Sequence, residues 1–566
     1  MIRKIFAFLF LGVVVGAAFA ADPAPGTLRK LINFKESAGS FDFFPSDEIP
    51  ETAAQSLNNL DYSISGSLRR RRGVQNFVSV TAPYVPIGSG ARNDSFWIYK
   101  TTTSHSYFIS RIGGAISHSP GLDTGIFDQN ILQPFVTGQV DAIQSNGDFY
   151  IVSEVTPIVK LTEVTPLTAL GMSYINRSPA GTMIKSHLDR FLISGSTRPG
   201  ENNIVYYSSA NDITSWPADN FFEVFAQSGE RITCLGDPIF GNMPLYTNRT
   251  TRLITGSDYP DPEDSTAGSE GNISVRLVYD GIGCSSPRSV KNVRNKQYFF
   301  SSGQDGQFPG IYEFNGVSVK EKTKAIRNYF RNTVQNSTAT LAIGYVYGDQ
   351  YCLNVATNGC ERPVTIVCVD DTDRIWQYSP FFVGMMTDLN GQSYIMNDLN
   401  GFNNNSPSCS AGNNPTYRIS LYDKLEEYDR FGDGTSPSVQ LFQIPWSYKT
   451  KDFSMDGEQG ENFASQKFPD RAYIKHSVST ATTYLNVQAN YDFGTSSSNW
   501  RIDVSTPYKT GNMLTVMRSS VAAVTKLLFD TGSRNLDFNF INFEIRSSSN
   551  ILVDSLDFYA GKRPLK

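Results

Sequence analysis

The four histidines are the side chains of this sequence best suited to acid–base chemistry near neutral pH. His105, His118, His187 and His476 stand far apart, and none has a nucleophile or carboxylate at the spacing of a hydrolytic motif. The sequence also contains no GxSxG, HExxH, Walker A or GxGxxG motif, which would indicate acyl transfer, zinc proteolysis or nucleotide binding. The sequence therefore predicts no catalytic residue, and a protein that is not an enzyme.

Metal and cofactor chemistry has equally little support. The acidic segment Asp258 to Asp264 offers oxygen ligands that suit Ca²⁺, but it lacks the EF-hand spacing and the terminal Glu, so we interpret it as a solvated loop. The cysteines form no CxxC pair and have no histidine at zinc spacing. Cys360 and Cys409 fall in Asn/Gly-rich sequence, where they either pair in an oxidising compartment or remain free thiols. We predict no metal site and no cofactor.

The run Arg69, Arg70, Arg71 and Arg72 is the one dense basic feature. Consecutive guanidinium groups bind phosphate or carboxylate groups bidentately. The run is therefore a candidate contact with a neighbouring subunit or with DNA. The alternative is a strand whose arginines point to solvent and to an adjacent acidic surface.

Residues 1–21 have the pattern of a secretory signal peptide. Arg3 and Lys4 precede an apolar run, and Ala18 and Ala20 occupy the two positions that a signal peptidase reads, with cleavage before Ala21 or Asp22. The alternative is an uncleaved hydrophobic arm that packs within an assembly. No other stretch has the roughly 18 apolar residues that a membrane span requires, so we predict no integral membrane span in the mature chain.

These side chains must be positioned by strands. Aromatic residues make up 13% of the 566 residues and charged residues 18%, and 45 residues are Gly, a profile typical of many short strands joined by turns. The formal net charge of −5 argues against a protein whose main function is to bind nucleic acid tightly. A wide channel through which DNA slides remains compatible with it.

A repeated pattern over residues 86–440 predicts a β-propeller, after an extended N-terminal arm at residues 22–85. Short aromatic or β-branched runs, each with a Gly, Asn or Asp turn, recur at intervals of about 42 to 54 residues, from SFWIYK at 95–100 to GYVYGDQYCLNV at 344–355. That interval matches one four-stranded blade, so we expect six or seven blades. A stacked array of sandwiches is the competing interpretation.

Turn residues support this assignment. The pairs Asn146-Gly147, Asn315-Gly316, Asn358-Gly359 and Gly348-Asp349 supply the positive φ that tight hairpins need. The Asn-rich segment Asp388 to Thr416 is expected to be a long exposed loop.

Residues 441–566 change character. The runs at 472–478, 482–493 and 540–548 alternate as half-buried antiparallel strands do, and the blade interval is lost. We expect a separate antiparallel β-sandwich, with the junction near 443–446.

Several segments together resemble the tail nozzle, or tail hub, proteins of podophages. EIPETAAQSLNNLDYSISGSLRRRRGV at 48–74 resembles the opening of that family, with the match carried by Asn59-Leu60-Asp61 and Arg72-Gly73. Further segments follow in the family's order, of which Ser215-Trp216-Pro217 and Gly281-Ile282-Gly283-Cys284 are the most specific. The resemblance covers roughly residues 45–450.

The resemblance implies a structural virion protein: a propeller that carries a sandwich-like platform and assembles into a homo-oligomeric, often hexameric, ring. Such a ring extends the DNA-ejection conduit, contacts portal or adaptor proteins and fibre or plug proteins, and lets double-stranded DNA pass transiently. The leader departs from the family pattern and points to export to the periplasm or cell surface. The alternative function is therefore a secreted or surface-bound β-propeller that binds glycans or proteins. A polysaccharide-cleaving propeller would need two carboxylates facing one cleft.

Overall fold

The computed structural model describes most of residues 139–378, with gaps at 155, 166–168, 225–229, 261–270, 304–306, 335, 348 and 357–362. Outside that stretch it describes 27–33, 39–40, 49, 53–62, 68–70, 75–76, 93–102, 105–112, 115–118, 386–389, 392–398, 417–422, 428–432, 439–443, 446–451, 453, 465–477, 484–491, 496–503, 513–518, 522–528, 541–547 and 553–564.

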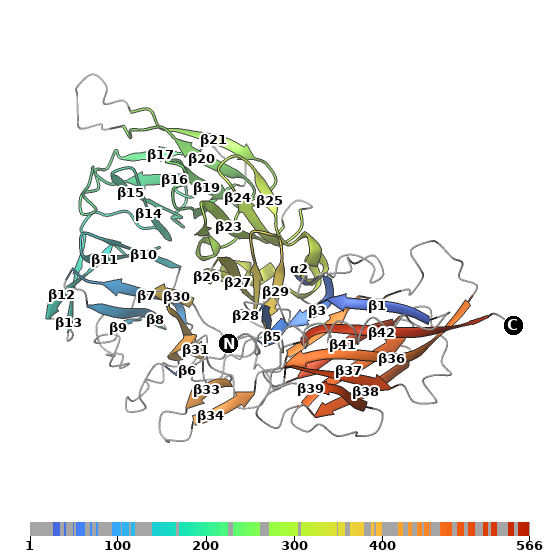
Figure 1. Ribbon diagram of the computed structural model, residues 1–566. Coiled ribbons are helices and arrows are strands. Elements are labelled where there is room, and N and C mark those ends of the chain that lie inside the picture. The colour runs from blue at the N-terminus through green and yellow to red at the C-terminus, as the bar shows by residue number, and fades with distance from the viewer. Residues whose placement is uncertain are drawn as a thin grey trace, which may run out of the picture.

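Six small antiparallel sheets and one antiparallel part of a larger sheet, each built mainly from consecutive strands, occupy the region where the blade pattern recurs (Figure 1). The first holds β7 (Asn93–Lys100), β8 (Ser106–Ile112) and β9 (Ala115–His118). The second holds β10 (Val140–Ser145), β11 (Asp148–Ser153), β12 (Val159–Thr165) and β13 (Ala169–Tyr174). The third holds β14 (Met183–His187), β15 (Arg190–Ser194), β16 (Ile204–Tyr207) and β17 (Phe221–Glu223).

The remaining four sheets follow the same plan. The fourth holds β18 (Ile232–Leu235), β19 (Met243–Thr247), β20 (Thr251–Thr255) and β21 (Ser274–Tyr279). The fifth holds β22 (Lys291–Val293), β23 (Lys296–Ser301), β24 (Gly310–Phe314) and β25 (Val319–Glu321). The sixth holds β26 (Ile343–Tyr347), β27 (Gln350–Ala356), β28 (Pro363–Val369) and β29 (Ile375–Tyr378), and the seventh β30 (Met386–Leu389), β31 (Gln392–Asp398), β32 (Tyr417–Tyr422) and β6 (Gln75–Asn76).

The inner strands of neighbouring sheets lie side by side and close a ring. β10 contacts β7 and β14, β14 contacts β18, and β18 contacts the turn η2 (Pro287–Ser289) that leads into β22. β26 contacts β22 and β30, and β30 in turn contacts β7 of the first sheet. The described strands therefore form a seven-bladed β-propeller, which confirms the predicted fold class at the higher of the two expected blade numbers.

The second strand of a blade is buried on both faces because neighbouring blades cover it. In β11, Phe149 and Ile151 pack with the first blade, whereas Tyr150 and Val152 pack with the third. Strands β15, β19, β23 and β27 are buried in the same way. A strand with two buried faces needs a nearly continuous apolar run, and this explains the aromatic runs that recur along the sequence.

Two of the predicted tight turns lie within the described residues in full. Asn146 (φ 50°) and Gly147 (φ 85°) join β10 to β11, and Gly316 (φ 91°) lies in the turn between β24 and β25. The Asn315 side-chain oxygen accepts hydrogen bonds from the backbone N–H groups of Val317 and Ser318 at 3.0 and 2.8 Å. Both hairpin predictions are confirmed, whereas Asn358-Gly359 lies outside the described residues.

The predicted long loop from Asp388 to Thr416 is wrong in its first part. β30 and β31 form a hairpin there, with Leu389 paired to Gln392 and Asn390-Gly391 between them. Asn-Gly is a favoured sequence for two-residue hairpin turns, so a high asparagine content does not exclude strands on either side of such a pair. Residues 399–416 lie outside the described residues.

Two sheets form the C-terminal sandwich. One has the order β39 (Met513–Arg518), β40 (Ala522–Leu528), β36 (Ser465–Ser477), β42 (Val553–Pro564), β5 (Leu68–Arg70) and β4 (Leu60–Tyr62), with β1 (Thr27–Asn33) also paired to β42. The other includes β3 (Ala53–Asn58), β35 (Trp446–Thr450), β41 (Ile541–Ser547), β37 (Tyr484–Tyr491) and β38 (Ser496–Asp503). A further hairpin, β33 (Tyr428–Gly432) and β34 (Val439–Gln443), precedes them.

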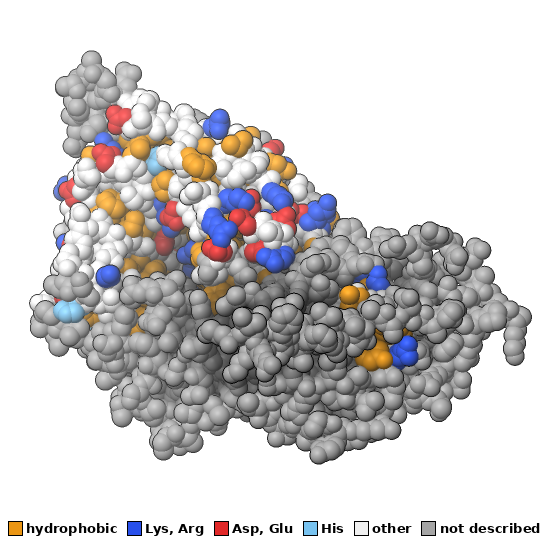
Figure 2. Space-filling view, in the orientation of Figure 1, with side chains coloured by type: hydrophobic (Ala, Val, Ile, Leu, Met, Phe, Trp, Pro, Cys, Tyr) orange, Lys and Arg blue, Asp and Glu red, His pale blue; other side chains and the backbone are white. Residues whose placement is uncertain are grey.

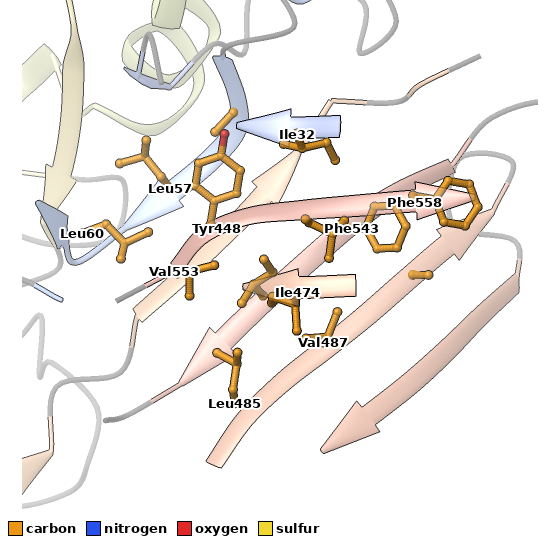
Figure 3. Packing of buried hydrophobic residues seen from close by; sticks show 14 of the residues in the cluster. Ile32, Leu57, Leu60, Tyr448, Ile474, Leu485, Val487, Phe543, Val553 and Phe558 are labelled. Carbon is orange, nitrogen blue, oxygen red and sulfur yellow. The ribbon is translucent and has the colours of Figure 1, made fainter. Parts of the chain in front are cut away.

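The inner faces of these sheets share one core (Figure 3). Ile474 and Phe558 come from the first sheet, and Val487 and Phe543 from the second. The rings of Phe543 and Phe558 meet edge to face with centroids 5.2 Å apart. The predicted antiparallel sandwich is confirmed.

The N-terminal arm is built into both parts of the molecule. β1, β4 and β5 join the first sandwich sheet, β3 joins the second, and β6 completes the seventh blade. Ala54, Leu57 and Leu60 are buried in the sandwich core. The apolar residues of this predicted extended arm supply strands to sheets whose other members come much later in the chain.

Blade six and the sandwich are joined by one continuous sheet. β29 pairs in parallel with β2 (Gly39–Ser40), β2 pairs in parallel with β3, and β3 pairs with β35. The backbone N–H of Asn59 also donates to the Gln377 carbonyl at 3.0 Å. Trp376 of blade six belongs to the sandwich core. The propeller and the sandwich thus share both hydrogen bonds and apolar packing.

Helical structure is sparse in the described residues and includes α2 (Arg327–Thr333), whose Phe330 packs against the outer part of blades five and six. No helix among the described segments has the length and apolar character needed to cross a bilayer.

Candidate functional site

A cavity of about 580 Å³ lies on the propeller axis, at the end where the inner strands begin. Its wall includes Gln139, Thr182, Ile232, Ser285 and Thr340, which precede or open the inner strands of blades two to six. The loop between β15 and β16 also contributes to the wall. Five blades therefore build one hollow, and its volume is within the range of small-ligand sites.

Three arginines from separate segments line this cavity. Arg198 comes from the β15–β16 loop, Arg231 directly precedes β18, and Arg288 lies in η2 ahead of β22. Of the described lining residues, Glu154 is the one carboxylate, and its side chain accepts a hydrogen bond from the backbone N–H of Gln139 at 3.4 Å. The cavity is therefore predominantly cationic.

Further charged groups lie deeper along the inner strands. Lys185 of β14 has its Nζ 3.4 Å from Asp237 Oδ1 and 3.9 Å from Asp141 Oδ2. Although burial opposes it, the attraction of these two carboxylates raises the pKa of Lys185. Lys185 in turn holds the pKa of Asp237 below its usual value. Burial, together with repulsion from Lys185, lowers the pKa of Lys291 on β22.

A glycosidase uses two carboxyl groups about 5 to 9.5 Å apart. The described cavity wall offers Glu154 alone, and the deeper carboxylates Asp141 and Asp237 both contact Lys185. The described residues also contain no group of three or more His, Cys, Asp or Glu side chains placed to hold a metal ion. That the protein is not an enzyme remains a prediction.

The histidines do not converge on the cavity. In the first blade, His105 Nδ1 lies 2.8 Å from Glu163 Oε1, which also accepts a hydrogen bond from the Tyr107 hydroxyl at 2.9 Å. In the third blade, His187 Nε2 lies 3.0 Å from the Gly241 carbonyl and Nδ1 lies 2.6 Å from the Tyr259 hydroxyl. Burial lowers the pKa of His187, which favours the neutral ring. These contacts join strands and turns of the blades.

His118 and His476 are also buried. The edge of His118 packs against the Tyr107 ring with centroids 5.8 Å apart, and His476 lies in β36 of the sandwich.

The arginine run lies near one end of the first sandwich sheet. Arg69 and Arg70 belong to β5, opposite Asp61 and Leu60 of the neighbouring β4, which is the last strand of that sheet path. Arg71 and Arg72 lie outside the described residues, as do the predicted cleavage residues Ala18, Ala20 and Ala21. The proposed subunit or DNA contact of Arg69–Arg72 stays a prediction.

Two disulfides were not anticipated from the sequence. Cys234 of β18 bonds to Cys284, which precedes the fifth blade, and Cys352 of β27 bonds to Cys368 of β28. Cys360 and Cys409 lie outside the described residues. The first bond links two blades, and the second links neighbouring strands of one blade.

An ion-pair network joins blades five and six, and Figure 2 shows blue and red side chains gathered over this part of the surface. Lys296 Nζ lies 3.0 Å from Asp371 Oδ1, and Lys320 Nζ lies 2.6 Å from Asp373 Oδ2. Lys322 reaches both Asp373 and Glu313 from a buried position. The network fixes the outer edge of one blade against the next.

The fold and its axial cavity define a seven-bladed β-propeller with a sandwich body. No protein-family model and no curated protein matches the sequence. Solved structures share part of the shape. The extracellular domain of a putative hybrid two-component system from B. thetaiotaomicron is 9% identical, with a TM-score of 0.36 over 67% of this chain and 45% of that chain.

Two other solved structures are similar in the same limited sense. An exo-β-1,3-galactanase from Phanerochaete chrysosporium is 10% identical, with a TM-score of 0.23 over 75% of this chain and 96% of that chain. YCF48 bound to D1 peptide is 12% identical, with a TM-score of 0.31 over 61% of this chain and 97% of that chain. This chain spans less than half of the B. thetaiotaomicron domain, and likeness at these TM-scores carries no conclusion about function.

Proposed function

We propose that the protein has a structural and not a catalytic role, as a subunit of a phage tail nozzle ring. The observation that carries the proposal is the sheet that runs from blade six through β2 and β3 into the sandwich. It makes the propeller and the sandwich one body, which is the propeller-plus-platform form that the sequence resemblance implies. A ring subunit needs such a body, because closed symmetry places the same two surfaces in contact around the ring.

The arginine run belongs to this proposal as the candidate subunit contact. Arg69 and Arg70 lie one strand from the end of a sandwich sheet. Arginine side chains suit contact with a carboxylate-rich surface on a neighbouring subunit.

Assembly of the full chain tests the proposal. Mass photometry and negative-stain microscopy of purified protein should show closed rings, and substitution of Arg71 and Arg72 by Gln should shift the population toward monomers. Monomers alone at micromolar concentration, with no binding to portal or adaptor proteins, would contradict the ring.

A second candidate function is an exported, surface-bound or secreted β-propeller that binds glycans or proteins. Two observations favour it: the signal-peptide pattern of residues 1–21, and the disulfides Cys234–Cys284 and Cys352–Cys368. Disulfides form and persist mainly in oxidising compartments.

Expression of the full chain in a bacterial host with separation of its compartments distinguishes the two. Periplasmic protein that begins at Ala21 or Asp22, and that carries both disulfides in non-reducing peptide mass spectra, would support export. Uncleaved cytoplasmic protein that forms rings would support the nozzle.

A further inference from the structure

We propose that the axial cavity binds an oxyanion ligand, a carboxylate or a phosphate, through Arg198, Arg231 and Arg288. Neither proposed function assigns this site, and the inference does not depend on ring assembly or on export.

Glu230 and Glu201 lie close to Arg231 and Arg198 in the chain, and each of these carboxylates also interacts with other groups. Glu230, the chain neighbour of Arg231, is buried, pairs with Arg252 at 3.6 Å and accepts a hydrogen bond from Thr250 at 3.2 Å. The closest Arg198–Glu201 approach is 3.8 Å, and Glu201 also accepts a hydrogen bond from Ser196 at 2.8 Å. An anion bound in this hollow would interact favourably with the guanidinium groups that line it.

Three hydroxyl groups of the cavity wall already donate hydrogen bonds to the protein. Thr233 donates to the Cys284 carbonyl at 2.6 Å, Ser285 donates to the Ser302 hydroxyl at 2.9 Å, and Thr182 donates to the Gly195 carbonyl at 3.4 Å. A neutral sugar would need such hydroxyls both as donors and as acceptors. The guanidinium groups are the positively charged donors of the described wall, and such groups favour carboxylate or phosphate oxygens.

The deeper wall is balanced in formal charge. Lys185 and Lys291 lie a few residues further along the inner strands from the cavity, on β14 and β22. Successive residues of a strand advance by about 3.3 Å, so the backbone of these residues lies roughly 10 Å along the strands from the cavity wall. Asp141 and Asp237 offset the two lysines, so the excess of basic groups comes from the arginines of the cavity wall. A narrow, protein-walled opening concentrates such a field.

Isothermal titration calorimetry of the full chain tests the site with three probes. Tripolyphosphate and trigalacturonate present phosphates and carboxylates, respectively, and neutral maltotriose is the size-matched control. We expect saturable one-to-one binding of at least one anion that weakens as salt rises, and no binding of maltotriose. The preference between the two anions then assigns the ligand as phosphorylated or as carboxylated.

Arg231→Gln and Arg198→Gln should each weaken anion binding about tenfold, as expected for the loss of a charge-assisted hydrogen bond. Both positions are exposed, so the variants should keep the thermal melting temperature of the parent protein. Arg276→Gln is the matched control, because it removes the same charge from exposed β21 at the outer edge of blade four. The proposal is wrong if Arg276→Gln weakens binding as much, if maltotriose binds as tightly, or if neither anion binds at millimolar concentration.

Discussion

Lys322 carries its charge in a buried position between two blades, with 1% of its side chain exposed. Its Nζ lies 3.3 Å from Glu313 Oε2 and also contacts Asp373, and the Tyr298 hydroxyl donates to Glu313 at 2.9 Å. A buried ion pair adds little net stability when intact, but losing one partner leaves the other desolvated and less well compensated.

We predict that Lys322→Met lowers the free energy of unfolding by about 3 kcal/mol, measured by urea denaturation. Lys320→Met is the control, since Lys320 pairs with the same Asp373 but is 58% exposed, and it should cost less than about 1 kcal/mol. Equal losses in the two variants would contradict the assignment of Lys322 as a buried charge.

The carboxylates of the same network give the blade junction a pH dependence. The hydrogen bond from Lys296 lowers the pKa of Asp371, and hydrogen bonds from Lys320 and Lys322 lower the pKa of Asp373 although burial opposes them. A carboxyl group whose pKa is lower in the folded than in the unfolded state stabilises the folded state at pH values above the ordinary pKa of Asp. This stability is lost as the pH falls through the depressed pKa.

We therefore expect the network to weaken below about pH 4. Asp371→Asn should lower the urea midpoint at pH 7, and the difference from the parent protein should shrink progressively toward about pH 2.5. Asp219→Asn, at an exposed position of blade three, is the control and should change neither midpoint. A difference that stays constant with pH would show that the charge of Asp371 is irrelevant to its role.

Hairpins are the elements that the sequence defines best. Asn146-Gly147 has positive φ at both residues, and an added Cβ at Gly147 would lie 2.5 Å from Thr102 Cγ2 of the neighbouring blade. Gly200 has a similar φ of +84°, but nothing lies within 4 Å of its added Cβ. Both glycines have a positive φ, but an added Cβ would contact a neighbouring side chain only at Gly147.

Gly200→Ala should cost about 1 kcal/mol from the left-handed backbone alone, and Gly147→Ala about 2–3 kcal/mol because Thr102 must also move. Thermal melting of the two variants provides the comparison. If both variants lose the same stability, the contact with Thr102 does not contribute to the cost of Gly147→Ala.

The blades could be predicted because their signals are local. An apolar run and a turn dipeptide define each hairpin, as in GDFYIVS after Asn146. Asn390-Gly391 is the same turn dipeptide, but it stands in an Asn-rich segment that was interpreted as a loop. Cys352 and Cys368 lie opposite each other on β27 and β28, at equal distances from Cys360, whereas a two-residue turn at Asn358-Gly359 would place Cys352 opposite Thr365. The turn dipeptide alone therefore does not predict this disulfide.

The role of the arm could not be predicted in this way. Leu57 of β3 pairs with Tyr448 of β35, and β1 pairs with β42, so the partners of these arm strands lie hundreds of residues away. Nothing in the local pattern of a strand specifies which distant edge it joins. The axial cavity is equally non-local, since its arginines come from loops of different blades.

At the scale of the whole molecule, the shared core predicts that blade six and the sandwich unfold together. Leu57 is buried in that core, whereas Leu192 is buried among blades three to five. Either Leu→Ala change should cost about 2–5 kcal/mol.

Hydrogen-exchange mass spectrometry in urea should therefore show that Leu57→Ala speeds exchange in β27 of blade six and in β37 of the sandwich by similar factors. Leu192→Ala is the matched control and should act mainly within the propeller. Faster exchange in β37 alone after Leu57→Ala would show that the continuous sheet does not couple the two parts.

The pairing of β1 with β42, in which Thr27 lies opposite Gly561, places a condition on biosynthesis. The ribosome makes β1 long before it makes β42. The sandwich can be completed only after β42 has been made, and contacts between such distant residues form slowly. The segment ahead of β1 consequently emerges long before the strand beside it has a partner, which gives any targeting machinery a long interval in which to recognise it.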